Sequence, residues 1–135
     1  MKLWLLFRKT HKWGAVITAL PLLLIIISGI FLQFKKNSSW IQPPTQTGTP
    51  LQLDIAFDTV LERVSAHPGS SVTVWKDVNR IDIRPDKGIM KVLCNNNLEI
   101  QLDTATGTIL QASIRRSDKI EDIHDGSWFF PGAKL

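Results

Sequence analysis

Residues 13–34 carry the sequence WGAVITALPLLLIIISGIFLQF, which contains no charged side chain. A helix of this length rises about 33 Å, enough to cross a hydrocarbon core of roughly 30 Å. Pro21 interrupts the run, but membrane helices tolerate proline better than soluble helices do. The alternative, a cleaved signal peptide, has an apolar region of about 7–15 residues and a small-residue cleavage site. The longer run, followed by Lys35 and Lys36, favours an uncleaved transmembrane helix.

The charges of the chain are arranged around this apolar run. The first twelve residues carry +4, Lys35 and Lys36 add +2, and the remainder carries −2, which gives the net +4 of the 135-residue chain. Basic residues accumulate on the cytoplasmic side of membrane helices. Residues 1–12 are therefore predicted to form a cytoplasmic basic flank, and the C-terminal part is predicted to lie on the other side of the membrane. For the inner membrane of a bacterial cell, that side is the periplasm. Because the positive charge belongs to a flank and not to a folded face, it does not indicate nucleic-acid binding.

Two sets of residues are predicted to act in the membrane. Tryptophan is enriched at membrane–water interfaces, which makes Trp4 and Trp13 on one side and Trp40 on the other candidate interfacial anchors. One helix face repeats at spacings of three and four and contains small side chains, which let membrane helices approach closely. This predicted packing face consists of His11, Gly14, Thr18, Pro21, Ile25 and Ser28.

The remaining chain predicts a linker over residues 35–50 and a small α+β domain over 51–116, in which a helix packs on an antiparallel sheet. The helix is expected within 53–69, with an apolar stripe of Leu53, Phe57, Leu61 and Val64. Alternating apolar and polar residues then predict short strands joined by tight connections. The expected strands are 71–75, 80–85, 89–95, 98–103 and 108–114. The single cysteine, Cys94, excludes an intrachain disulfide and is expected to be buried.

Three motifs resemble the PepSY-associated transmembrane family of bacterial membrane proteins. The first opens the apolar helix, the second is the hairpin Leu102-Asp103-Thr104-Ala105-Thr106-Gly107, and the third is Ile123-His124-Asp125-Gly126. The matching positions are Arg8, His11, Trp13, Gly14, Asp103, Gly107, His124 and Gly126. The resemblance implies a PepSY-like domain outside the membrane. It also implies a further membrane helix after Gly126, so residues 117–135 are expected to form a short helix and tail that either lead to a missing second helix or end the chain.

Some larger members of that family are haem-containing membrane reductases, so His11 and His124 are candidate haem ligands. The two histidines are expected on opposite sides of the membrane helix, and no histidine lies within residues 13–34. A haem is therefore expected only if it is shared with another chain. Glu121 and His124, three residues apart, are weak candidate metal ligands among the acidic residues of 118–125.

The sequence contains no catalytic triad, phosphate-binding glycine loop or buried carboxylate pair. It therefore predicts a non-catalytic accessory or scaffolding subunit, anchored in the lipid bilayer and docked to a larger membrane protein complex. The expected contacts are the helix face and the edge strands of the sheet. A fragment or subunit of a haem-dependent reductase for iron–siderophore complexes is one alternative. A periplasmic regulator or inhibitor of a peptidase is the other.

Overall fold

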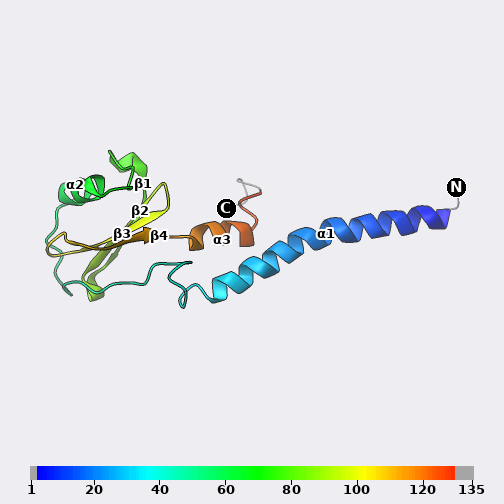
Figure 1. Ribbon diagram of the computed structural model, residues 1–135, viewed down its shortest axis with the longest axis horizontal. Coiled ribbons are helices and arrows are strands. Elements are labelled where there is room, and N and C mark those ends of the chain that lie inside the picture. Colours follow the sequence, from blue (N-terminus) through cyan, green and yellow to red (C-terminus); the bar gives the residue numbers. More distant parts are fainter. Residues whose placement is uncertain (1–2, 130–135) are drawn as a thin grey trace. The chain divides into compact units, whose positions relative to one another are not determined.

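The computed structural model describes residues 3–129 and divides into two compact units (Figure 1). The helical unit contains residues 1–37 and 117–135, and the sheet unit contains residues 38–116. Residues 130–135, the end of the predicted tail, lie outside the described residues.

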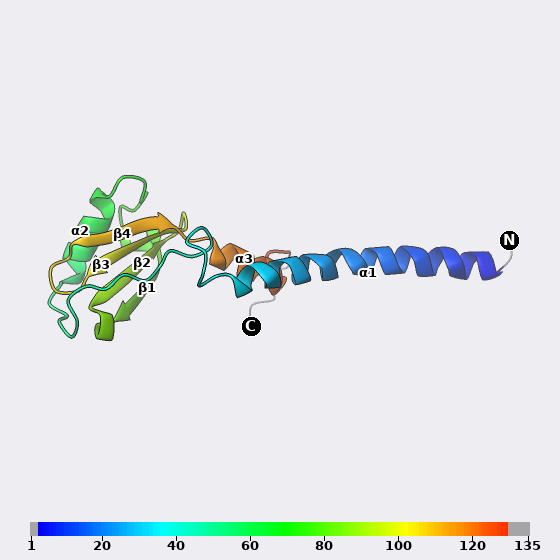
Figure 2. The ribbon, with the colours of Figure 1, turned by 60° about the horizontal axis from the view of Figure 1, so that its bottom comes forward.

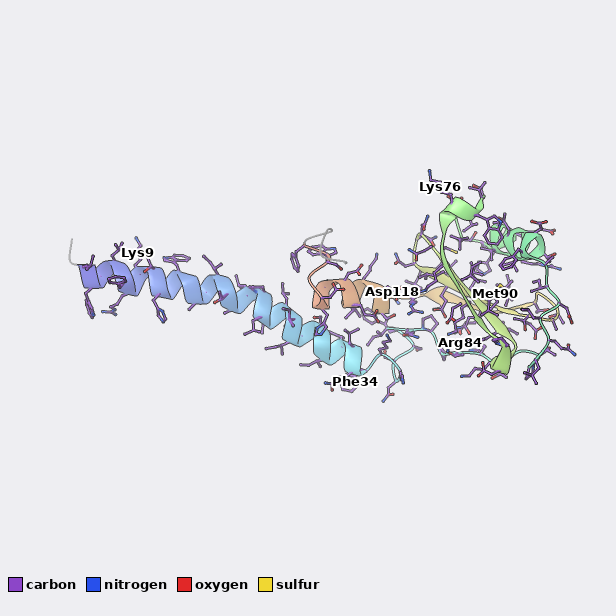
Figure 3. All side chains as sticks on the ribbon, turned by 180° about the vertical axis from the view of Figure 1, so that it is seen from behind. Lys9, Phe34, Lys76, Arg84, Met90 and Asp118 are labelled. Carbon is purple, nitrogen blue, oxygen red and sulfur yellow. The ribbon has the colours of Figure 1, made fainter. Side chains whose placement is uncertain are left out.

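The helical unit consists of two helices of very different length. Helix α1 (Leu3–Gln33) has 31 residues and begins ten residues before the predicted membrane segment, so most of the basic flank is helical. It continues through Pro21, and its ribbon is curved between Lys9 and Phe34, which lie near its two ends in Figure 3. Helix α3 (Ser117–His124) packs against α1. The short helix expected after residue 117 is therefore confirmed.

The sheet unit contains four antiparallel strands in the order β1-β2-β3-β4 (Figure 2). Their bounds are Val78–Arg84 for β1, Ile89–Cys94 for β2, Leu98–Asp103 for β3 and Ile109–Ile114 for β4. Val92 of β2 pairs with Ile81 on one side and Ile100 on the other, which places apolar side chains of three strands on one face. Strands β2, β3 and β4 lie where the alternation of the sequence predicts them.

Helix α2 (Phe57–Ala66) covers the apolar face of the sheet. Val60 and Val64 of α2 are at most 1% exposed and pack among the inward side chains of the strands. Cys94 belongs to this core and is buried, as expected, and burial raises the pKa of its thiol. The arrangement is the predicted α+β class, with a helix on one face of an antiparallel sheet.

The helix begins later than its apolar stripe predicts. The backbone N–H groups of Asp54 and Ile55 both donate to the carbonyl of Thr104, which keeps this segment extended beside the sheet. Leu53 and Phe57, predicted to face the core, are therefore 54% and 56% exposed. The buried face is centred on Val60 and Val64, so the second half of the predicted stripe, Leu61 and Val64, does pack on the core.

Residues 71–75 form no strand, although their alternation predicts one. The carboxylate of Asp77 accepts hydrogen bonds from the backbone and hydroxyl of Thr73 and from the backbone of Val74. The first of these bonds is the main reason that the pKa of Asp77 is lowered. This side-chain cap replaces a strand ladder and leads into the short 3-10 helix Trp75–Asp77.

Most of the predicted linker belongs to the sheet unit. Residues 38–50 contain no helix or strand, yet Ile41 and Pro43 are buried and the backbone of Gly48 donates to the carbonyl of Lys87. We call residues 41–50 the strap. The strap lies across the sheet face opposite α2, because its contacts are with the outward side chains of β2 and β3.

Candidate functional site

The apolar surface of α1 is the most unusual feature of the helical unit. Its large apolar side chains are exposed along the whole helix; Ile17, Leu20 and Leu22, for example, are 65%, 61% and 58% exposed. Within residues 3–129, α1 is the one helix long and apolar enough to cross a membrane, a property that anchors and signal sequences share. An exposed apolar surface on this scale is typical of segments that contact lipid or another protein.

His124, the last residue of α3, lies against α1. Its Nδ1 atom is 3.0 Å from the carbonyl oxygen of Ile25 and 3.3 Å from the hydroxyl oxygen of Ser28. Because the carbonyl can only accept a hydrogen bond, Nδ1 is the donor in this contact. Ser28 is 5% exposed and is buried within the described part of α1. The imidazole and the hydroxyl thus form a polar contact on an otherwise apolar helix.

Two further contacts hold α3 against α1. A Cβ atom added to Gly29 would lie 3.1 Å from Cε1 of His124, so the glycine allows the imidazole to approach the helix closely. Lys35, just after α1, and Glu121, in the middle of α3, form a partly exposed ion pair. An exposed pair of this kind contributes little free energy, but it favours one alignment of the two helices.

An apolar cavity of about 550 Å³ lies beside this contact. It is lined by Leu20, Pro21, Leu24 and Ile25 of α1 and by Ile123, Gly126 and Phe129 of the C-terminal segment. Gly126 has a φ of +80°, a left-handed conformation that favours glycine and turns the chain after α3. Gly126 and Phe129 thus lie beside the apolar surface of α1.

The structure divides the predicted packing face of α1 into two parts. Ile25 and Ser28 contact the chain's own α3 through His124. Thr18 bonds to the carbonyls of its own helix, and among residues 3–129 a Cβ added to Gly14 would find no neighbour within 4 Å. The part of the face around Gly14 and Thr18 is thus exposed in the described structure.

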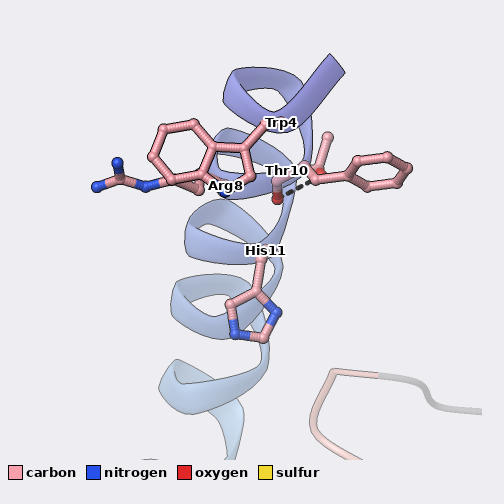
Figure 4. A pocket seen from close by; sticks show the side chains of 5 residues that line it. Trp4, Arg8, Thr10 and His11 are labelled. Atoms are coloured by element: carbon pink, nitrogen blue, oxygen red, sulfur yellow. Dashed lines mark hydrogen bonds between the residues drawn. The ribbon is translucent and has the colours of Figure 1, made fainter. Parts of the chain in front are cut away.

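His11 lies on a different region of α1, shown in Figure 4. It is exposed and lines an open depression together with Trp4, Phe7, Arg8 and Thr10. The guanidinium group of Arg8 lies 4.6 Å from the ring centroid of Trp4, a cation–π contact. Arg8 and His11 of the predicted N-terminal motif thus share one end of the helix with the aromatic side chains of Trp4 and Phe7.

The position of His124 corrects one sequence-based expectation. The position of His124 in the sequence predicts that its side chain lies beyond the predicted membrane helix. The structure places it beside Ile25 and Ser28, within the apolar segment. It remains distant from His11, because fourteen residues of helix separate His11 from Ile25, or about 21 Å. The two imidazoles of one chain therefore do not fit a single haem between them.

The candidate metal ligands do not converge either. Glu121 is paired with Lys35, and His124 contacts α1. In the part of the chain that the structure describes, no group of three or more His, Cys, Asp or Glu side chains could hold a metal ion.

The predicted tryptophan anchors belong to different units. Trp4 and Trp13 are exposed on α1. Trp40 belongs to the sheet unit, where the guanidinium group of Arg116 lies 4.7 Å from its ring and also bonds to its carbonyl. The anchoring role of all three residues stays a prediction.

Asp103 and Gly107 form the turn between β3 and β4. One carboxylate oxygen of Asp103 accepts the backbone N–H groups of Ala105 and Thr106, and the other accepts the backbone and hydroxyl of Thr49 in the strap. Burial alone would raise the pKa of Asp103, but these hydrogen bonds lower it to about 2. Gly107 has a φ of +70°, and a Cβ there would lie 2.7 Å from Ile55. The motif thus has a structural role in joining the turn, the strap and the segment before α2.

The sequence did not reveal a buried polar layer beneath the strap. We call it the polar face: Lys91, Glu99, Gln101, Asp103 and Arg115. Glu99 is 1% exposed and accepts hydrogen bonds from Lys91 at 3.4 Å, Gln101 at 2.8 Å and Arg115 at 2.9 Å. Burial lowers the pKa of Lys91, opposed by the attraction of Glu99. The alternation of β3 shows which residues share this face, but nothing in the sequence shows that the strap covers it.

Comparisons with known proteins give no relative: no protein-family model, curated protein or solved structure matches the chain. Function is therefore argued from the geometry of the two units.

The contact between α1 and α3 predicts that substitutions at Gly29 and Gly14 affect the packing of α3 differently. Gly29→Leu is expected to displace His124 and loosen α3, because even a Cβ at this position is tight. Gly14→Leu is the control for α3, since its Cβ meets nothing. Amide hydrogen exchange of the full chain in mild detergent should show at least tenfold faster exchange of α3 in Gly29→Leu only. Equal protection of α3 in both variants would contradict the observed packing.

Proposed function

We propose that this chain is a non-catalytic, membrane-anchored accessory subunit of the PepSY-associated transmembrane class. In this proposal α1 spans the bacterial inner membrane with the basic end in the cytoplasm, and the sheet unit lies in the periplasm. The observation that carries the proposal is the exposure of large apolar side chains along α1. The resemblance of the three motifs supports the class, and the distribution of basic residues supports the orientation.

The partner in this proposal is a larger membrane protein. The uncovered packing surface around Gly14 and Thr18 supports a helix–helix contact within the membrane, since small residues allow close approach. In the sheet unit, β1 and β4 are the outer strands, and their edges support pairing with an extended partner segment. Gly14→Leu is therefore expected to weaken co-purification with the membrane partner while leaving α3 protected.

Fractionation and topology reporters test the anchoring. The full-length chain should stay in the membrane pellet after carbonate extraction, at its uncleaved mass. Alkaline phosphatase fused after residue 135 should be active, and green fluorescent protein fused before residue 1 should fluoresce. A shortened, soluble product would instead identify residues 1–34 as a cleaved signal sequence and refute the anchor.

A subunit of a haem-dependent membrane reductase is the second candidate function, and the position of His124 favours it. With Nδ1 donating to the carbonyl of Ile25, Nε2 is the ring nitrogen left to serve as a ligand. Because His11 is about 21 Å away along α1, the second ligand would come from another chain. A Soret band in the detergent-extracted complex that is lost in His124→Ala would support this candidate, and its absence would reject it.

A further inference from the structure

The strap is held on the polar face mainly through its main-chain atoms. The side-chain amide of Gln101 accepts a hydrogen bond from the backbone N–H of Gln46 at 2.9 Å and donates to the carbonyl of Pro44 at 3.0 Å. Asp103 accepts the backbone N–H of Thr49 at 2.7 Å. Contacts of this kind recognise an extended backbone and depend little on its side chains.

The buried apolar side chains of the strap lie at its start. Ile41 and Pro43 are buried, whereas Pro44, Thr47 and Pro50 are exposed. Thr45 accepts a hydrogen bond from Lys91 at 2.8 Å. Each neutral hydrogen bond of the segment contributes little net free energy, because water offers an equivalent bond when the segment leaves. Residues 44–50 of the strap can therefore open locally while the apolar core on the other face stays intact.

The buried charges of the polar face also contribute less to folding stability than a purely structural layer would require. Lys91 and Glu99 are 3% and 1% exposed, and buried ion pairs are often no more stabilising than apolar residues of similar volume. A permanent cover for a sheet would be better served by apolar side chains. Buried charges beside a glutamine that bonds to a main chain are instead typical of a surface that binds a polar segment.

From these contacts we propose that the polar face is a binding site for an extended, proline-containing peptide segment of a partner protein. The strap occupies this site in the absence of the partner and is displaced when the partner binds. Gln101 and Asp103 bind the peptide backbone, and Lys91 donates to a hydroxyl side chain that directly follows a proline, as it does to Thr45 after Pro44. The proposal concerns the sheet unit and does not rest on the membrane anchor.

Gly48 offers a way to displace the strap without changing the polar face. A Cβ there would lie 2.3 Å from the carbonyl oxygen of Gly88 and 2.7 Å from a carboxylate oxygen of Asp103, so Gly48→Ala should lift this part of the strap. Thr47→Ala is the matched control, because Thr47 is an exposed neighbour in the same segment. The probe is a fluorescein-labelled peptide with the strap sequence IQPPTQTGTP, added to the full chain in mild detergent.

Fluorescence anisotropy should show that Gly48→Ala binds the probe at least tenfold more tightly than the natural chain or Thr47→Ala. In those two proteins the attached strap competes at high effective concentration. The double variant Gly48→Ala with Gln101→Ala should lose the added affinity. Equal binding by all variants, or binding indifferent to Gln101, would overturn the proposal.

Hydrogen exchange of the natural chain tests whether the strap opens by itself, and it does not depend on the folding of Gly48→Ala. The amides of Gln46, Gly48 and Thr49 should exchange at least tenfold faster than those of β2 and β3, because the strap opens alone. Exchange of the strap only together with global unfolding would show a permanent structural cover and overturn the proposal.

Discussion

Replacing Glu99 by Gln is expected to lower the free energy of unfolding of the sheet unit by about 3–5 kcal/mol. The carboxylate is 1% exposed and is the shared partner of Lys91 and Arg115, so a neutral amide leaves two cations in a largely dry layer. The NH2 group of the new amide would also face a donor, either that of Arg115 or those of Lys91 and Gln101. Few single substitutions in this unit remove so many contacts.

The effect can be measured in the full chain by urea dependence of amide exchange in β2 and β3, which reports the opening of the core strands. The exchange of α3 provides an internal reference, because it belongs to the helical unit. A loss below about 1 kcal/mol would show that water reaches Glu99 and that the layer is not buried as described.

Lys91→Met is the matched control and should have a much smaller effect. Glu99 would keep Arg115 and Gln101 as partners, and the lowered pKa of Lys91 indicates that burial already disfavours its ammonium form. A lowered lysine pKa means that the unfolded chain binds more protons in the alkaline range, so stability rises as pH approaches the ordinary value of 10.5. Lys91→Met should remove that alkaline rise.

Hydrophobic patterning made much of the fold predictable. The uncharged run of residues 13–34 defines the body of α1, and the alternation of β2, β3 and β4 places their inward and outward residues correctly. These elements bury apolar side chains at regular intervals, so the spacing of apolar residues in the sequence predicts them. The turn at Asp103 was also recognisable, because its carboxylate and Gly107 satisfy strict local geometry.

The parts that the sequence did not reveal depend on side-chain bonds between distant segments. Asp77 converts the apparent strand at 71–75 into a capped turn. Gln101 and Asp103 fix a strap that has no periodicity of its own. Spacing along the chain likewise could not show that His124 returns to Ser28, since that contact depends on the packing of α3 on α1.

Replacing Asp103 by Asn is expected to lower the free energy of unfolding by about 2 kcal/mol at pH 7. Hydrogen bonds from the turn and the strap outweigh the effect of burial and hold the pKa of Asp103 at about 2, against an ordinary value of 3.8. Between these values the unfolded chain binds more protons than the folded chain. The stabilisation is therefore complete above about pH 5 and is lost as the pH falls toward 2.

The variant should consequently differ most from the natural chain at neutral pH and least in acid. Asp86→Asn is the matched control, because Asp86 is an exposed carboxylate of the same unit. Urea unfolding of both variants and of the natural chain between pH 2 and 7, followed by exchange of β3 amides, gives the comparison. A constant difference across that range would assign the effect to lost packing, whereas convergence near pH 2 would assign it to the ionised carboxylate that joins the turn to the strap.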